Sequence, residues 1–189
     1  MDAQESSLNQ HALILLSGPI AAGKSTISKM LISKFGFKGL SSGDYLRALL
    51  DSANLPKTRE RLQELGDRLD LETNYEWLAE KVTTEAVAHE SQKKWIIDSV
   101  RKPQQITSHR KLFGKAVIHV HIIASPNILK DRYLARTNST EIEYLAAKMH
   151  PNEISSEELD KNANLTFDTS LMSTEDICDT IAKHAGIDV

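Results

Sequence analysis

The chain has 189 residues and a formal net charge of −3; 40% of its residues are hydrophobic and 26% are charged. This length suits a single domain with its own core, and the ordinary composition excludes collagen-like, low-complexity and wholly disordered proteins. The slightly acidic balance excludes a general attraction for a long polyanion such as duplex DNA, so nucleic acid is not an expected partner.

The single cysteine and the polar N-terminal residues indicate the cellular compartment. One cysteine, Cys178, cannot form an internal disulfide or supply a cysteine-rich zinc site, which suits a reducing environment. Residues 1–11 are polar and acidic, and no apolar run approaches the roughly 20 residues that span a bilayer. We therefore expect a cytoplasmic protein that does not insert into a membrane.

The predicted elements alternate between strands and helices. Residues 12–16 form an apolar run of strand length, and a helical pattern follows until Gly36. Further strands are predicted at residues 38–40, 95–98, 116–123 and 165–167, each followed by a helical pattern. Because tight hairpins cannot join parallel strands, this alternation predicts an α/β fold, with a mostly five-stranded parallel sheet between two helical layers.

Two helix-rich segments are longer than ordinary connections between strands. The first covers about residues 44–90 and is expected to be an acceptor-binding insert, with a lid over a substrate and additional core both left open as its role. The second covers about residues 137–162 and is broken by Pro151. His150, Pro151 and Glu153 indicate a turn there, which alternatively lies over a bound nucleotide as part of a lid. We expect one domain that carries both segments as inserts.

Residues 18–25 read GPIAAGKS and fit the pattern G-x-x-x-x-G-K-[S/T], after a predicted strand and at the start of a predicted helix. The glycines let backbone N–H groups wrap inward, and the helix directs its positive dipole end to the same point. A plain glycine turn would not need lysine followed by serine. The pattern predicts that ATP binds here, that Lys24 reaches its terminal phosphates, and that the Ser25 hydroxyl binds Mg²⁺. The predicted ATP-binding residues are Gly18, Ala21, Ala22, Gly23, Lys24, Ser25 and Thr26.

Asp98 ends the predicted strand at residues 95–98. In an open parallel sheet this position lies at the carboxyl edge, where ligands bind. A carboxylate there can hold Mg²⁺ through water, so Asp98 is the second predicted metal-binding residue beside Ser25. The alternative is an acid that caps the next helix.

Residues 41–47, SSGDYLR, resemble the Ser/Thr-Gly-Asp-x-Leu-Arg stretch of adenylate kinases and related nucleoside monophosphate kinases. In that family the segment binds the acceptor nucleotide. The resemblance implies that Arg47 pairs with an acceptor phosphate, that Ser42 lies near its base, and that Asp44 is close to the transferred group. By spacing alone, Ser42 or Asp44 is equally well explained as a helix cap.

Residues 98–105, DSVRKPQQ, resemble the Asp-Gly-Phe-Pro-Arg segment of the same family, and more closely the Asp-Gly-Ile-Arg type of its distant members. The glycine and the first proline are missing. The resemblance implies that Arg101 is a second ligand of the acceptor phosphate and that Gln104 or Gln105 reads the base, with Gln105 preferred. Two arginines can fix a phosphate because each offers bidentate hydrogen bonds.

Residues 131–136, DRYLAR, resemble the family's Asp-Arg-x-x-Gly-Arg run at the edge of the mobile lid. A spacing of four places Arg132 and Arg136 on one side of a helix, so both could close over the triphosphate. The alternative is two solvated arginines paired with neighbouring acids.

Two histidines in the predicted strand at residues 116–123 are candidate metal ligands. His119 and His121 share a face because strand side chains alternate. No partner set with metal-binding spacing accompanies them, so packed or hydrogen-bonded histidines are the preferred interpretation.

The resemblance runs from residue 13 to about residue 170 and implies a P-loop kinase. Its reaction would move the γ-phosphoryl group of ATP, with Mg²⁺, to a nucleoside or deoxynucleoside monophosphate, a small-molecule substrate. A phosphate acceptor needs alignment and charge neutralisation more than a base. The predicted catalytic residues are Lys24, Arg101, Arg132, Arg136 and Asp44.

Three alternatives remain open from the sequence. If the acceptor is a hydroxyl group, as a resemblance to dephospho-CoA kinases implies, Asp44 becomes the proton acceptor. A regulatory ATP-binding protein would hydrolyse ATP slowly and act through partners. A polynucleotide end kinase would bind oligonucleotides in a manner that weakens steeply with salt.

Overall fold

The computed structural model describes residues 12–89, 93–137 and 139–189. Within these residues, five strands form one parallel sheet in the order β2-β3-β1-β4-β5. The strands are β1 (Ala12–Ser17), β2 (Lys38–Leu40), β3 (Lys94–Ile97), β4 (Val117–Ile123) and β5 (Leu165–Asp168). The predicted α/β fold with a five-stranded parallel sheet is confirmed.

The helical elements are α2 (Lys24–Phe35), α3 (Ser42–Ser52), α4 (Arg59–Glu72), the π-helical turn η1 (Leu78–Thr83), α5 (Thr84–His89), α6 (Pro103–Phe113), the 3₁₀ turn η2 (Gly114–Ala116), α7 (Pro126–Thr137), α8 (Glu141–Lys148), α9 (Pro151–Glu157), the 3₁₀ turn η3 (Glu158–Asn162) and α10 (Thr174–His184). Local signals set several ends. Gly36 ends α2 with a φ of 70°, and Ser173 begins α10 by accepting a hydrogen bond from the Asp176 amide.

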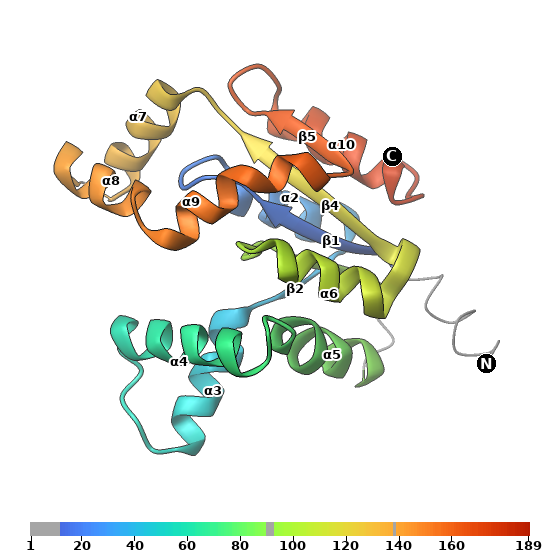
Figure 1. Ribbon diagram of the computed structural model, residues 1–189. Helices are drawn as coiled ribbons and strands as arrows, with labels where there is room; N and C mark the ends of the chain where they lie inside the picture. The colour runs from blue at the N-terminus through green and yellow to red at the C-terminus, as the bar shows by residue number, and fades with distance from the viewer. Residues whose placement is uncertain (1–11, 90–92, 138) are drawn as a thin grey trace.

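The central strand β1 is buried along its whole length because it has neighbours on every side. It pairs with β3 and β4 in register, so Leu13 lies between Trp95 and Val117. Helices cover both faces of the sheet, as Figure 1 shows. This arrangement explains why the sequence of β1 is continuously apolar rather than alternating.

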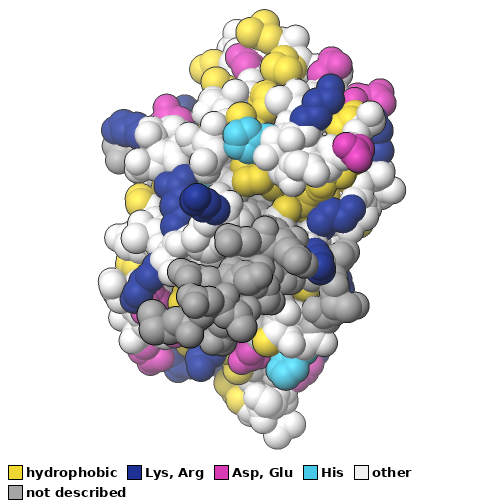
Figure 2. All heavy atoms as spheres, turned by 90° about the vertical axis from the view of Figure 1, so that its right-hand side faces the viewer, with side chains coloured by type: hydrophobic (Ala, Val, Ile, Leu, Met, Phe, Trp, Pro, Cys, Tyr) yellow, Lys and Arg dark blue, Asp and Glu magenta, His cyan; other side chains and the backbone are white. Residues whose placement is uncertain are grey.

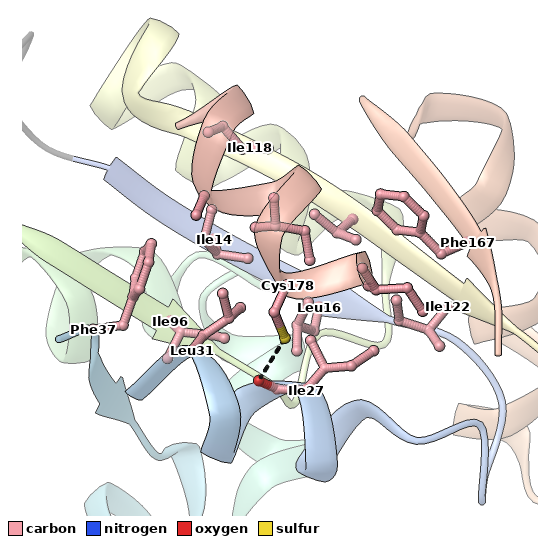
Figure 3. Close-up of a cluster of buried hydrophobic side chains, with 14 of the residues drawn as sticks. Ile14, Leu16, Ile27, Leu31, Phe37, Ile96, Ile118, Ile122, Phe167 and Cys178 are labelled. Carbon is pink, nitrogen blue, oxygen red and sulfur yellow. Dashed lines mark hydrogen bonds between the residues drawn. The ribbon is translucent and has the colours of Figure 1, made fainter. Parts of the chain in front are cut away.

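Two hydrophobic clusters hold the layers together. One joins α2 and α10 to the sheet face that carries Ile14 and Leu16, and Figure 3 shows most of its buried members. Cys178 lies buried in this cluster, 3.7 Å from the carbonyl oxygen of Ile27, and burial raises the pKa of its thiol to about 11. The cysteine is therefore a packing residue.

The other cluster joins β1 and β3 to the helices on the opposite face. From the segment between β2 and β3 it takes Leu65, Trp77 and Leu78, and Leu159 of η3 also joins it. Much of the first helix-rich segment is therefore core. Its assignment to an acceptor site, and that of the second segment to a lid, stay predictions.

The connection from β4 to β5 consists of α7 followed by the second helix-rich segment, which holds α8, α9 and η3. In Figure 1, α7 and α8 lie beyond the carboxyl end of the sheet and α9 crosses back toward it. In the face shown in Figure 2, basic and acidic side chains are mixed. Across the described part of the chain, the helices are too short or too polar for any to cross a membrane.

Candidate functional site

The loop between β1 and α2 has a backbone that few side chains tolerate. Gly18 has a φ of 132° and Gly23 of 103°, and Ala21 adopts the left-handed region with a φ of 64°. A Cβ atom on Gly18 would lie 2.0 Å from the carbonyl oxygen of Ile122 in β4. Glycine is therefore required where the loop leaves the sheet.

Helix α2 begins directly after this loop. Its N-cap is Gly23, and no side chain caps the first turn. Uncapped N–H groups and the positive end of the helix dipole make such a terminus suited to an anion.

Lys24 is held by the loop itself. Its Nζ atom donates hydrogen bonds to the carbonyl oxygens of Gly18 and Pro19, at 2.7 and 2.9 Å. Burial lowers the pKa of Lys24 to about 8, and the positive charge of Arg101 contributes, while the carboxylate of Glu153 opposes the shift. The ammonium group thus lies in a partly desolvated place where an added anion would be attracted strongly.

A cavity of about 660 Å³ opens at this loop, a volume within the range of small-molecule sites. It is lined by residues from the loop, from the end of β3, from α7 and α9, and from the segment after β5. The predicted site residues that line it are Ala21, Ala22, Gly23, Lys24, Ser25, Thr26, Asp98, Arg101, Arg132 and Arg136.

Ser25 and Asp98, the residues predicted to bind Mg²⁺, line the same cavity. Their hydroxyl and carboxylate oxygens are hard donors of the kind that Mg²⁺ prefers. Among the described residues there is no group of three or more histidine, cysteine or acidic side chains that could hold a metal by itself. A few protein oxygens together with ligand phosphates are the usual arrangement for Mg²⁺, so the residues present fit this ion.

Arg132 is tied to the phosphate loop through one threonine. Its guanidinium donates to the hydroxyl and to the carbonyl oxygen of Thr169, at 2.7 and 3.0 Å. The Thr169 hydroxyl in turn donates to the carbonyl oxygen of Ala22, at 2.9 Å. Thr169 follows β5 and is not among the predicted site residues, because no local pattern marks a contact with residues 37 and 147 positions away.

Arg101 lies in the loop before α6, and its guanidinium forms an ion pair with Glu153 of α9. Both residues line the cavity. The sequence predicted only that Glu153 lies in a turn or a lid. It did not predict that Glu153 lies near Lys24 and Arg101. The HPNE string at residues 150–153 was the available signal.

Four predicted acceptor residues lie outside the cavity lining: Ser42, Asp44, Arg47 and Gln105. Asp44 and Arg47 pair with each other at 2.6 Å, with 73% and 48% of their side chains exposed. The oxygen of the Gln105 side chain accepts hydrogen bonds from the backbone amides of Arg101 and Lys102, at 3.0 and 3.3 Å, and so closes the start of α6.

Ser42 touches the cavity wall indirectly. Its hydroxyl donates to that of Ser99, at 3.1 Å, and Ser99 lines the cavity. The cap of α3 is neither Ser42 nor Asp44, the two candidates by spacing. It is Ser41, whose hydroxyl accepts from the Asp44 amide at 3.1 Å.

The two strand histidines are hydrogen-bonded core residues. The Ser17 hydroxyl lies 2.7 Å from Nε2 of His119 and 2.8 Å from Nδ1 of His121, and all three side chains are buried. Burial lowers the pKa of His119 to about 4 and also lowers that of His121. The preferred interpretation of these histidines is confirmed.

Comparison with known proteins adds independent evidence. The model of a protein family described as "AAA domain" matches residues 17–147. Adenylate kinase isoenzyme 1 of Oryctolagus cuniculus is 27% identical over 134 residues, which cover 70% of this chain and 68% of the relative.

Solved structures are similar over nearly the whole chain. TT1252 from Thermus thermophilus has a TM-score of 0.59 at 17% identity and covers 95% of this chain and 99% of its own. The YorR protein of Bacillus subtilis, solved in complex with phosphorylated GDP, has a TM-score of 0.55 at 19% identity, with 93% and 96% covered. At these identities the likeness concerns the fold.

Proposed function

The chain belongs to the AAA domain family, and we propose that it moves the γ-phosphoryl group of ATP, with Mg²⁺, to the phosphate of a nucleoside or deoxynucleoside monophosphate. At a coarser level the assignment is plain: the chain is a P-loop phosphotransferase similar to nucleoside monophosphate kinases. The predictions of the P-loop kinase resemblance and of an enzyme are confirmed at that level.

On the donor side, the loop backbone and Lys24 would hold the terminal phosphates. Ser25 and Asp98 would hold Mg²⁺, which when bound neutralises charge on the phosphate oxygens. Lys24 would exchange its two carbonyl partners for phosphate oxygens, and its preorganised charge would favour the charge that develops on the migrating group.

The observation that carries the proposal is the convergence of Lys24, Arg101, Arg132 and Arg136 on one cavity. A protein that only binds and releases ATP does not need three arginines around its phosphate loop. Two anions, a triphosphate and an acceptor phosphate, account for this concentration of positive charge.

On the acceptor side, Arg101 would orient the acceptor phosphate so that one of its oxygens faces the γ-phosphorus. Alignment of this kind supplies most of the catalysis, because the acceptor phosphate is already a nucleophile. Arg47 would bind the acceptor only where the nucleotide extends out of the cavity past Ser42. The adenylate kinase relative and the nucleotide complex of YorR support a nucleotide as the acceptor.

The alternative with a hydroxyl acceptor assigned the base to Asp44. That carboxylate lies outside the cavity lining, and its hydrogen bond from Arg47 lowers its pKa. A weakly basic carboxylate at this place is poorly suited to take a proton at the phosphate loop. The geometry therefore favours a phosphate acceptor.

A substrate screen tests the proposal. The protein is incubated with ATP, Mg²⁺ and each nucleoside or deoxynucleoside monophosphate in turn, and ADP and the diphosphate product are measured. We expect one or a small group of monophosphates to be phosphorylated. Transfer to a hydroxyl compound alone, or ATP binding with no transfer to any acceptor, would contradict the proposal.

A further inference from the structure

The Arg101–Glu153 ion pair places an acidic side chain on the arginine that the acceptor phosphate is proposed to use. The side chain of Glu153 is only 9% exposed, whereas that of Arg101 is 40% exposed. One carboxylate oxygen of Glu153 meets the guanidinium. The other, Oε2, is buried and has no hydrogen-bond partner among the described residues. Burying a carboxylate oxygen without a hydrogen bond destabilises the folded state. The Arg101–Glu153 contact is therefore not part of a fully satisfied structural hydrogen-bond network.

Two other contacts hold the same segment against the rest of the protein. The Lys102 ammonium donates to the Ser155 hydroxyl at 2.9 Å, and Nε2 of Gln63 in α4 lies 2.7 Å from Nε2 of His150. Residues 150–155 thus touch both the loop before α6 and the insert helix α4. From this segment, Glu153 lines the cavity.

A carboxylate and a phosphate monoester compete for the same guanidinium because both accept its paired N–H donors. Both also carry negative charge, so they repel each other when they share a poorly hydrated place. Among the residues around Lys24, Glu153 is the strongest influence that favours its charged form, which places the carboxylate near the loop as well as near Arg101.

We propose that Glu153 is an internal competitor for the acceptor phosphate: it occupies Arg101 in the unliganded protein and must leave before the phosphate binds. This inference rests on the proposed function only in naming a phosphate as the competing anion. Displacement of Glu153 would also release the neighbouring Lys102–Ser155 contact, so acceptor binding would loosen the start of α9. Glu153 is in this sense a positioning residue that holds Arg101 and sets the affinity for the acceptor.

The test uses the full chain with its donor side filled by Mg²⁺ and a non-hydrolysable ATP analogue, so that added inorganic phosphate reports on the acceptor side. Calorimetry then compares the wild type with Glu153→Gln, which keeps the size of the side chain and removes its charge. We expect phosphate to bind Glu153→Gln about tenfold more tightly, since the competing charge is gone. Glu72→Gln, which neutralises an exposed carboxylate paired with Arg68 on α4, is the matched control and should leave phosphate affinity unchanged.

Hydrogen exchange distinguishes displacement from simple repulsion. In the wild type, phosphate should increase amide exchange in residues 151–157. In Glu153→Gln exchange should already be high without phosphate. Glu153→Ala provides a second variant with the same expectation. Tighter phosphate binding with no change in exchange would show that Glu153 stays in place, which overturns the proposal.

Other outcomes also overturn it. These are unchanged or weaker phosphate affinity in Glu153→Gln, no phosphate binding to any variant, and a loss of turnover above about a hundredfold with unchanged phosphate affinity, the sign of a catalytic base. The proposed function can fail separately. If no monophosphate is phosphorylated but Glu153→Gln still binds phosphate more tightly, the competition stands and the substrate assignment falls.

Discussion

The ammonium group of Lys24 lies 2.7 Å from the carbonyl oxygen of Gly18, the residue six positions earlier that opens the same loop. The backbone carbonyl groups of the loop therefore hold the Lys24 ammonium group close to where a phosphate would lie. Burial makes this placement unfavourable for the charged form, as the lowered pKa of about 8 indicates. Lys24 is therefore expected to lower the stability of the folded protein while it contributes to its activity.

Lys24→Met should separate these two effects. We expect turnover to fall about a hundredfold or more, because a preorganised charge on the migrating group is lost. We also expect the free energy of unfolding at pH 7 to rise by about 1 to 3 kcal/mol, because a partly buried cation is removed. Turnover assays and denaturant unfolding measure the two quantities.

The pH dependence provides the control for Lys24→Met. The folded pKa is lower than the unfolded one, so the unfolded wild type binds more protons between about pH 8 and pH 10. Wild-type stability should gain from Lys24 as the pH rises through this window, and the variant should lack that gain. Equal slopes would contradict the assignment of a buried, charged lysine.

Gly18→Ala tests the close approach of the loop to β4. The new Cβ would lie 2.0 Å from the carbonyl oxygen of Ile122, in a backbone with a φ of 132°. We expect a loss of about 3 kcal/mol or more in unfolding free energy, since a strained backbone and a steric clash add. Gly114→Ala is the matched control: its φ is 53°, and nothing lies within 4 Å of the added atom. A similar loss in both variants would mean that only the backbone conformation matters at Gly18.

The strands and the phosphate loop were predictable because their signals are local. Apolar runs of strand length followed by glycine mark β1, and lysine and serine after Gly23 mark the start of α2. The carboxyl end of β3 followed from the same logic, which is why Asp98 was expected at the cavity and lies there.

The contacts that shape the cavity were not predictable in the same way. Arg101 meets Glu153 across 52 positions and Arg132 meets Thr169 across 37, and only tertiary packing brings such pairs together. Asp44 and Arg47 show the opposite case. Their spacing of three on one helix already permits an ion pair, and that local pair forms outside the cavity lining.

Arg47→Ala tests whether the arginine on α3 reaches the acceptor. We expect a KM for the acceptor raised about tenfold with ATP affinity unchanged, because one charge-assisted contact to the acceptor phosphate is lost. Arg68→Ala, on the exposed side of α4 where Arg68 pairs with Glu72, is the control and should alter neither. A loss of ATP affinity in Arg47→Ala would place this arginine on the donor side, and no change at all would confine it to its pair with Asp44.

Acid should destabilise the fold through its buried histidines. The Ser17 hydroxyl carries one proton and lies between ring nitrogens of His119 and His121, so it donates to one ring and accepts from the other, and a second proton on the accepting ring disrupts the hydrogen bonding. Burial lowers the pKa of His119 and of His109 to about 4, so both rings stay neutral in the folded chain at pH 5. The unfolded chain takes up these protons near pH 6.5, and the folded state loses about 2 kcal/mol per histidine by pH 4.5.

Denaturant unfolding between pH 7 and pH 4.5 measures this loss. His119→Asn removes one titrating ring, so it should be less stable than the wild type at pH 7 but lose less on acidification. His184→Gln, at an exposed position near the end of α10, should keep the wild-type slope. Because the His119 ring is hydrogen-bonded to Ser17, the last residue of β1, its protonation strains the strand end from which the phosphate loop departs. ATP affinity should therefore fall over the same pH range in the wild type, and less steeply in His119→Asn. An equal pH slope of stability in all three proteins would mean that His119 is already charged, or is free to hydrate, in the folded chain.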